Sequence, residues 1–394
     1  MLFLAVVLFF NTFLPSVAAW LANRWLVDDH PVPALPFLWP SDAPLETVVV
    51  ELESYLEQHV SLAQAGLDLL NVVIDKTHLA ELRSPENASF LVLCRNDELY
   101  SMLETVQSIN DRYNHQFSHD WVFLNDEPFD EFFMIGIALA IPGGKISFGQ
   151  VPKEHWGSPL WIDPGKAAAA RQELLAKDVY KANSTSYRNM CRFYLGFFYK
   201  HLLLDGYDYY WRLEPGVKYS CDIGYDVFQF MRENKRDYGF TLALFEYRDT
   251  IATLWETSKK YFNQLALPQD NLVEFLQNLD GLYNLCHFWL NFEIASLAFF
   301  RSREYQAYFD HLDQAGGFFY ERWGDAPIHT MAVAHLLNKS RLWWFGDIGY
   351  WHSPYLQCPR GKTFLDRKCS CNIEADFTFT DLSCVPLYLS LQGQ

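Results

Sequence analysis

The spacing of hydrophobic residues divides the chain into stretches of helical and of strand character. Over residues 45–73 apolar positions recur every three or four residues, which predicts an amphipathic helix. The short apolar run 89–95 predicts a buried strand, after which Asn96 or Asp97 is placed to cap a helix. That helix has one apolar face, and residues 120–126 predict the strand that follows it. The pattern here is that of a βαβ unit.

The rest of the chain alternates in the same manner. Helices are predicted over residues 163–182 and from Ser186, as cap, to Leu204, and a strand over 208–213. Further helices are expected near 270–280, 283–300 and 329–337. No Gly-rich phosphate-binding turn follows the first strand, so a dinucleotide-binding Rossmann site is not expected. A nucleotide-binding α/β sheet agrees with this order.

The first 22 residues form an apolar stretch of about the length that spans a bilayer. We interpret it as an export signal, either retained as a signal anchor or cleaved after residues 16–18, and we favour the anchor. Almost no positive charge precedes it, although Arg24 follows. Residues 28–44 contain five prolines, which suits an extended stem. The predicted division is therefore 1–22 signal anchor or signal peptide, 23–44 stem, and 45–394 luminal catalytic domain.

The charge of the chain limits which partners it can bind, and its cysteine content indicates the compartment in which it folds. The formal net charge is −17 with no run of Lys and Arg, which excludes nucleic acid as a partner. An anionic small substrate would need a metal ion or clustered arginines. Eight cysteines in an exported chain favour disulfides, whose pairing cannot be read from spacing. Sequons at Asn87, Asn183 and Asn338 agree with a luminal location.

Glu214 is the first candidate for chemistry. It follows the predicted strand 208–213 directly, and the carboxyl edge of an α/β sheet is where such folds bind ligands. A carboxylate there suits a divalent cation that bridges the phosphates of a nucleotide-sugar. The simpler interpretation is an acidic turn residue.

The helix predicted from Ser186 carries a second set of candidates. Tyr187 lies in its first turn, and Arg188 and Arg192 are four residues apart on one face. A helix N-terminus with arginines suits a phosphate, and Tyr187 is placed to hydrogen-bond a nucleotide. A surface arginine pair beside a half-buried tyrosine is the structural alternative.

Three further polar residues lie among aromatic neighbours. Glu293 is expected at the margin of a packed region, where its carboxylate would face an anomeric carbon and stabilise positive charge. Asp325 and His352 lie within aromatic and turn residues, as sugar-binding residues often do. The alternatives are a core hydrogen bond for Glu293 and a structural role for the histidine.

Taken together, several long motifs resemble, in order, the fungal α-1,2-mannosyltransferase family, also called glycosyltransferase family 15. The motifs are FLNDEPF (123–129), GQVPKEHW (149–156), YRNMCRFYLGFF (187–198), YWRLEP (210–215), CDIGYDVF (221–228), CHFWLNFEI (286–294), FFYERWGDAPIH (318–329) and IGYWHSPYLQCP (348–359). The resemblance implies a Rossmann-like nucleotide-sugar transferase fold of the GT-A type, with a mixed sheet and one catalytic domain. It also implies a single-pass type II protein of the Golgi membrane that takes part in protein glycosylation.

The resemblance further implies a retaining enzyme that uses GDP-mannose and Mn²⁺ and extends mannosylated acceptors on O-linked or N-linked glycans. Glu214 and His352 would hold the metal, and a nitrogen ligand beside oxygen suits manganese better than magnesium. Asp325 would lie near the sugar or the acceptor hydroxyl, and Glu293 would be the nucleophile, in either a covalent or a same-face path. The residues expected on the nucleotide side are Tyr187, Arg188, Arg192 and Arg212.

One position departs from the pattern of the family. Gly216 stands where some relatives have a second acid, so a single carboxylate would hold the metal. Two rival functions follow from the residues. One is a catalytically weak or inactive mannan-binding or assembly subunit, and the other is a glycoside hydrolase that uses Glu293 and Asp325 as its carboxylate pair.

Overall fold

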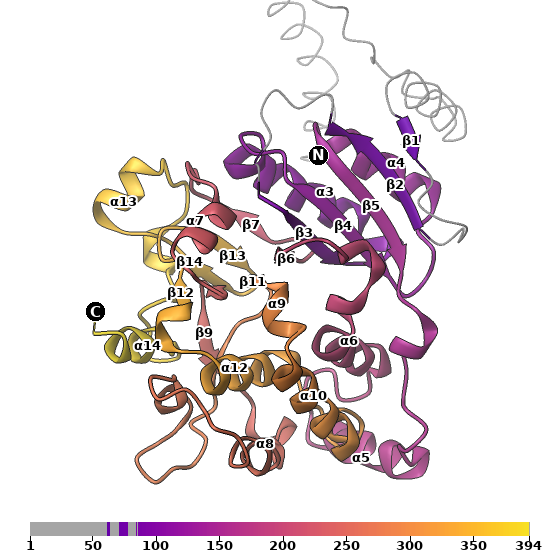
Figure 1. Cartoon of the computed structure of the whole chain (residues 1–394), viewed down its shortest axis with the longest axis vertical. Coiled ribbons are helices and arrows are strands. Elements are labelled where there is room, and N and C mark those ends of the chain that lie inside the picture. The colour runs from indigo at the N-terminus through magenta and orange to yellow at the C-terminus, as the bar shows by residue number, and fades with distance from the viewer. Residues whose placement is uncertain (1–60, 64–70, 78–83, 85, 394) are drawn as a thin grey trace, which may run out of the picture. The chain divides into compact units, whose positions relative to one another are not determined.

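The computed structural model describes residues 61–63, 71–77, 84 and 86–393 (Figure 1). All of them belong to one compact unit, Leu52–Gln394. The predicted export segment, the stem and most of the predicted 45–73 helix lie outside the described residues, so these boundaries stay predictions. Among the described residues, no helix has both the length and the apolar character needed to cross a bilayer.

The described strands form one large mixed sheet and two small ones (Figure 1). The large sheet is built from β1 (Ser61–Ala63), β2 (Asn71–Lys76), β3 (Ala88–Leu93), β4 (Asp120–Asn125), β5 (Gly144–Gln150), β6 (Tyr209–Leu213), β8 (Tyr238–Phe240), β11 (Glu293–Ser296) and β12 (Leu342–Trp344). Their spatial order is β1-β2-β5-β4-β3-β6-β11-β8-β12. The small sheets are built from β7 (Lys218–Tyr219), β9 (Ala243–Phe245), β10 (Cys286–Phe288), β13 (Tyr350–His352) and β14 (Tyr355–Gln357), in the orders β10-β9 and β14-β13-β7.

The centre of the large sheet is parallel. Strand β4 pairs with β3 and β5, and β3 pairs with β6, all in parallel, whereas β11 runs antiparallel to β6. The three central strands are buried almost throughout, which explains their continuous apolar sequences. The predicted βαβ unit and the predicted strand at 208–213 are confirmed. Because β3, β4 and β6 end at one edge, the residues that follow them meet there.

Helices cover this sheet and form a second layer. The described α-helices are α3 (Leu99–Ile109), α4 (Glu131–Ala140), α5 (Pro164–Ala176), α6 (Thr185–Gly196), α7 (Val227–Glu233), α8 (Leu254–Phe262), α9 (Leu297–Phe300), α10 (Arg303–Ala315), α11 (Gly317–Tyr320), α12 (Asp325–Leu336), α13 (Gly361–Asp366) and α14 (Val385–Leu391). The chain also contains one π-helical turn, η3 (Asn110–Asn114), and short 3-10 helices. The 3-10 helices are η2 (Asn96–Glu98), η4 (Lys153–His155), η5 (Phe198–Lys200), η6 (Leu202–Leu204), η7 (Arg248–Thr250), η8 (Val273–Leu276), η9 (Lys339–Arg341) and η10 (Ile373–Ala375). Helices α6, α10 and α12 pack on one another (Figure 1).

Several predicted elements are wrong. Val73, at the end of the predicted 45–73 helix, lies on β2. Residues 283–300 form β10, β11 and the short α9 in place of one helix, and only η8 forms within 270–280. Both strands are fully buried, and a segment that is apolar on all sides gives no period by which strand and helix can be told apart.

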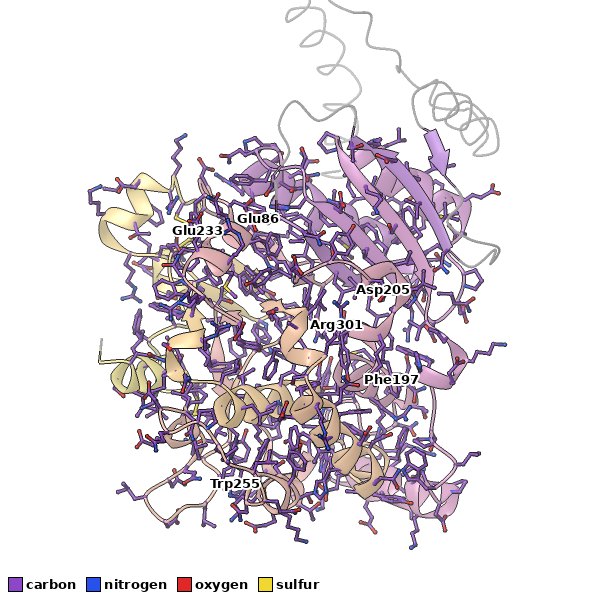
Figure 2. The ribbon with its side chains drawn as sticks, in the orientation of Figure 1. Glu86, Phe197, Asp205, Glu233, Trp255 and Arg301 are labelled. Atoms are coloured by element: carbon purple, nitrogen blue, oxygen red, sulfur yellow. A yellow bond between two sulfur atoms is a disulfide. The ribbon has the colours of Figure 1, made fainter. Side chains whose placement is uncertain are left out.

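The predicted helix from Ser186 to Leu204 is shorter than expected. Its cap is Ser184, whose hydroxyl accepts from the N–H of Tyr187, and α6 ends at Gly196. After it, η5 and η6 are held by Arg301, labelled in Figure 2. The guanidinium of Arg301 donates to the carbonyl groups of Tyr199, Leu204 and Tyr207 at 3.2, 2.9 and 3.1 Å.

Three disulfides join six of the described cysteines. Cys221–Cys369 and Cys286–Cys384 tie the C-terminal region to the body, and Cys358–Cys371 closes a short loop. Cys94 and Cys191 are free and buried. The sequence showed the crowding of cysteines after residue 357, and the fold supplies their partners.

Candidate active site

Glu214 lies directly after β6, at the carboxyl edge of the sheet. Helix α3 fixes its backbone: the hydroxyl of Thr105 donates to the carbonyl of Glu214 at 3.1 Å and accepts from the N–H of Gly216 at 2.9 Å. Gly216 has a φ of +86°, a conformation that disfavours a side chain. The glycine that departs from the family pattern is therefore the residue that this turn favours.

Strand pairing brings His352 to Glu214. Strand β7 follows the Glu214 turn, and β13 pairs with it antiparallel, with Tyr350 opposite Tyr219. Two residues beyond Tyr350, the Nε2 atom of His352 lies 3.4 Å from Oε2 of Glu214. The two side chains keep 28% and 27% of their surface exposed, so both are open to a ligand.

Arg212 joins the carboxylates of Asp325 and Glu214. Its Nη1 lies 2.6 Å from Oδ2 of Asp325, and its Nη2 lies 2.7 Å from Oε1 of Glu214. The guanidinium is buried and lies 3.6 Å from the ring centroid of Tyr194 on α6. Asp325 is the first residue of α12, where the helix dipole also favours a negative charge. The site therefore holds two carboxylates on one arginine.

The charges of this group stabilise one another. Burial opposes ionisation of Glu214, but Arg212 and His352 outweigh it and lower its pKa to about 2. Burial likewise opposes the charged form of His352, and Glu214 outweighs it and raises the histidine pKa above the ordinary 6.5. Burial also opposes the charge of Arg212, yet Asp325 and Glu214 raise its pKa well above its ordinary value. Glu214 is thus an anion at any physiological pH.

These ligand atoms fit a divalent cation. Arg212 occupies Oε1 of Glu214, which leaves Oε2 facing the imidazole of His352. Two ligands of one octahedral cation, each about 2.1 Å from it, lie about 3 Å apart, close to the 3.4 Å between these atoms. Within the described ranges, the one group of three or more candidate ligand residues, Cys221, Cys369 and Cys371, consists of cysteines in disulfides.

Tyr187 lies beside the start of α12. The guanidinium of Arg322 lies 5.0 Å from its ring centroid, and its hydroxyl lies 3.7 Å from where a side chain on Gly324 would begin. Burial raises the pKa of Tyr187 well above its ordinary value, so the hydroxyl is a neutral donor. Because Gly324 precedes Asp325, Tyr187 and Asp325 belong to the same region of the site.

Arg188 and Arg192 are buried and bind groups of the protein, whereas a phosphate contact was predicted for them. Arg192 binds both oxygens of Asp313 at 2.8 Å each, and both side chains are nearly fully buried. Arg188 has no exposed surface and donates to the carbonyl groups of Ser184 and Glu321 at 3.0 and 3.3 Å. Burial lowers the pKa of Arg188 to about 10. These contacts fasten α6 to its neighbours and favour a structural role for both arginines.

Glu293 lies inside the core, and the expectation that it sits at the margin of a packed region is wrong. It lies opposite Arg212 in the β6–β11 pair and has no exposed surface. One oxygen is 2.8 Å from Nδ1 of His329, and the other accepts from the hydroxyl of Tyr210. Burial opposes ionisation, but His329 and Tyr210 outweigh it and lower the pKa of Glu293. Glu293 is a buried anion held in place on both sides.

Sequence reasoning missed four residues of this region. Arg95, after β3, is exposed, and its Nη2 lies 2.6 Å from the hydroxyl of Ser186 at the start of α6. Arg322 lies 3.6 Å from Glu246, and Tyr194 supports Arg212. Arg95 ends the predicted strand 89–95, and this position at the ligand edge of the sheet could have identified it from the sequence. Glu246 is far from Arg322 in the sequence, and only the fold brings the two together.

Comparisons with known proteins place the chain in a family. A model of the glycolipid 2-alpha-mannosyltransferase family matches residues 53–393. The probable mannosyltransferase MNT3 of Candida albicans is 46% identical over 336 residues, which cover 85% of this chain and 88% of that protein. The alpha-1,2 mannosyltransferase KTR1 of Saccharomyces cerevisiae is 48% identical over 321 residues, which cover 80% and 81%.

Solved structures share the fold. Core-mannan synthase A (CmsA/Ktr4) of Aspergillus fumigatus, in its Mn/GDP form, is 35% identical with a TM-score of 0.75 and covers 84% of this chain and 92% of its own. Ktr4p of S. cerevisiae in complex with GDP is 34% identical with a TM-score of 0.74 and covers 90% and 93%. The predicted α/β fold of the GT-A type with a mixed sheet is confirmed. The chain belongs to the glycolipid 2-alpha-mannosyltransferase family, the fungal family that its sequence motifs resemble.

Proposed function

We propose that this protein is a retaining α-1,2-mannosyltransferase that moves mannose from GDP-mannose to mannosyl acceptors of O-linked or N-linked glycans and depends on Mn²⁺. The observation that carries the proposal is the pairing of Glu214 and His352 at the carboxyl edge of the sheet, 3.4 Å apart and accessible. The Mn/GDP form of a solved relative and the names of the α-1,2-mannosyltransferase relatives support it.

Glu214 and His352 would hold the cation, which when bound neutralises charge on the leaving diphosphate. Two features provide further positive potential beside it. Arg95 is an exposed cation at the end of β3, and it contacts Ser186 in the first turn of α6. The N-terminus of that helix favours an anion. Arg95, with Tyr187, therefore replaces Arg188 and Arg192 on the proposed nucleotide side.

Asp325 and Glu293 are the proposed groups on the sugar side. Arg212 holds one oxygen of Asp325, which leaves the other to accept from a sugar hydroxyl. Both oxygens of Glu293 have partners inside the core, so we assign to it electrostatic stabilisation of an oxocarbenium-like charge in place of direct attack. This assignment favours the same-face path, in which the acceptor hydroxyl attacks the mannosyl cation on the face that the diphosphate leaves.

The test is transfer by the purified protein. GDP release from GDP-mannose with methyl α-mannoside as acceptor should require Mn²⁺, stop with a chelator and return when Mn²⁺ is restored. NMR of the product reads the linkage. An inactive assembly subunit would release no GDP. A glycoside hydrolase would cleave mannosides without nucleotide, and the complete burial of Glu293 argues against its use in a carboxylate pair.

We further propose a single-pass type II protein of the Golgi membrane. The apolar residues 1–22 support a membrane anchor, and three disulfides and the exposure of the sequon residues Asn87, Asn183 and Asn338 support a luminal catalytic domain. The test is the location of the tagged protein and a mobility shift after glycosidase treatment of membranes. Fractionation with cytosol and no shift would contradict the proposal.

A further inference from the structure

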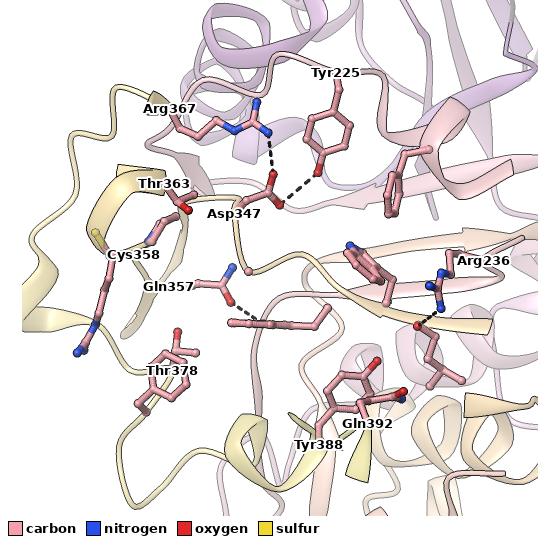
Figure 3. A pocket seen from close by; sticks show the side chains of 18 residues that line it. Tyr225, Arg236, Asp347, Gln357, Cys358, Thr363, Arg367, Thr378, Tyr388 and Gln392 are labelled. Carbon is pink, nitrogen blue, oxygen red and sulfur yellow. Dashed lines mark hydrogen bonds and ion pairs between the residues drawn. The ribbon is translucent and has the colours of Figure 1, made fainter. Parts of the chain in front are cut away.

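A separate pocket lies along β12, the edge strand of the large sheet (Figure 3). Its volume is 810 Å³, within the range of about 300–1,000 Å³ typical of small-molecule sites. Its walls come from β12, the loop before β13, helix α7 and the chain from Cys358 to Gln392. None of the metal, nucleotide or sugar residues proposed above lines it.

Aromatic rings form much of its wall. Trp343 and Trp344 on β12 are half-buried, and Phe379 is 51% exposed. Phe379 meets Trp344 edge to face, with ring centroids 6.3 Å apart, and Trp343 packs on Phe230 with centroids 5.1 Å apart. Rings that are fixed on one side and open on the other offer flat apolar faces, which match the C–H face of a pyranose.

Polar groups lie beside these rings. Gln357 is held rigidly, since its amide nitrogen donates to the carbonyl groups of Phe345 and Ile348 and its oxygen accepts from the indole of Trp344 at 3.0 Å. The hydroxyl of Thr378, which is 1% exposed, has no hydrogen-bond partner in the described part of the chain, and neither does Nε of Arg236. Polar side chains beside the rings suit a ligand that carries hydroxyls as well as an apolar face.

Acids in and around the pocket face two of its three arginines. Asp347 accepts from Tyr225 at 3.2 Å and from Arg367 at 3.1 Å, as the dashed lines in Figure 3 show. Arg360 lies 3.0 Å from Asp376. Arg236, the third arginine of the wall, donates to the carbonyl groups of Ser340 and Leu342. Because all three arginines already have oxygen partners within the protein, the pocket is better suited to a neutral ligand than to an anion.

We propose that this pocket binds a neutral mannosyl oligosaccharide, namely a part of the acceptor glycan away from the mannose that reacts. The inference rests on the proposed function for the identity of the glycan. The chain runs from Asp347 in the pocket wall to His352 at the metal pair within one short segment, so the pocket and the active site share the β12–β13 connection. Two separate contacts with one glycan would favour long acceptors over single sugars.

The experiment measures sugar binding and transfer on the full chain. Calorimetry without donor or metal, using an α-1,2-linked mannotriose, compares the wild type with Trp343→Ala and Phe379→Ala. Phe379 is half exposed, so its variant is expected to fold, and Tyr180→Ala, at a 69% exposed position outside the pocket, is the matched control. Binding should weaken at least about tenfold in both pocket variants, in line with loss of an aromatic contact, and stay unchanged in the control.

Kinetics then separate this inference from the proposed function. In the pocket variants, KM for the mannotriose acceptor should rise by a similar factor, while kcat with methyl α-mannoside stays at the wild-type value. Equal binding by wild type and both variants, or displacement of the sugar by inorganic phosphate, would overturn the inference. Absence of any transfer by the wild type would overturn the proposed function, and binding lost only in the pocket variants would still support the sugar site.

Discussion

Asp325 at the start of α12 accepts a 2.6 Å hydrogen bond from Arg212 on β6. The same guanidinium binds Glu214, so one buried cation fixes two carboxylates that come from distant parts of the sequence. Its removal therefore affects both stability and the metal pair, and the two effects can be measured separately.

Arg212→Met should lower the free energy of unfolding by about 3–5 kcal/mol, because it leaves two partly buried carboxylates without their cation. Urea denaturation measures the change. Lys362→Met is the control, since Lys362 and Asp366 are 85% and 55% exposed in their ion pair, and exposed pairs of this kind add little to stability. Equal losses in the two variants would mean that the buried cluster adds nothing to stability.

Glu214→Ala should reduce Mn²⁺-dependent kcat/KM at least about 100-fold, because it removes the ionised metal ligand while the turn backbone keeps its bonds to Thr105. GDP release and Mn²⁺ binding measured by electron paramagnetic resonance give the readouts. Glu256→Ala, at a 62% exposed carboxylate, is the matched control. Undiminished turnover in Glu214→Ala would remove the metal assignment.

Glu293→Gln should lower kcat about 100-fold or more with KM for GDP-mannose nearly unchanged, because the amide keeps the volume but removes the buried negative charge. Circular dichroism checks that the variant folds. Both Glu293 oxygens are bonded to neighbours, so part of the effect will be on stability. A wild-type kcat in a folded Glu293→Gln protein would assign Glu293 to structure alone.

His335 should make the fold sensitive to acid. It stacks on Phe262 with centroids 3.9 Å apart, and burial lowers its pKa from 6.5 to about 4. The unfolded chain therefore binds the proton first, and stability that is complete above pH 6.5 is lost as the pH falls toward 4. Between pH 6.5 and pH 4 the free energy of unfolding of the wild type should fall by about 3 kcal/mol more than that of His335→Gln. If both proteins lost the same stability as the pH fell, His335 would not be the cause of the acid sensitivity.

The disulfides should differ in their effect on stability. In the chain-entropy model, the bond between Cys286 and Cys384, 98 residues apart, contributes about 5 kcal/mol, and the bond between Cys358 and Cys371, 13 residues apart, about 3 kcal/mol. Thermal unfolding of the two paired Cys→Ser variants tests the order. A larger loss for the short loop would show that chain entropy does not govern these bonds.

The sequence predicted the elements that have a clear local pattern. Continuous apolar runs gave β3, β4 and β6, and the position of Glu214 after one of them located the ligand edge. The same rule fails for β10 and β11, because they are only three and four residues long and lie with α9 in one largely apolar stretch that has the length of a helix.

The site was predicted only in part, and for a physical reason. Glu214 and His352 meet because β7 and β13 pair, a contact between segments that no local pattern reveals. Arg188 and Arg192 have the spacing of a phosphate clamp, yet their partners, such as Asp313, become visible only when α10 packs on α6. Residue type and spacing indicate what a side chain is able to bind, and tertiary packing decides what it does bind.

The order of the cysteines along the chain has a consequence for biosynthesis. Cys221 and Cys286 emerge from the ribosome well before their partners Cys369 and Cys384. During that interval the two early thiols are available to each other, and a wrong bond between them must be exchanged before the native pairs form. Maturation of this enzyme should therefore be slow and dependent on a thiol isomerase, however quickly its parallel strands assemble.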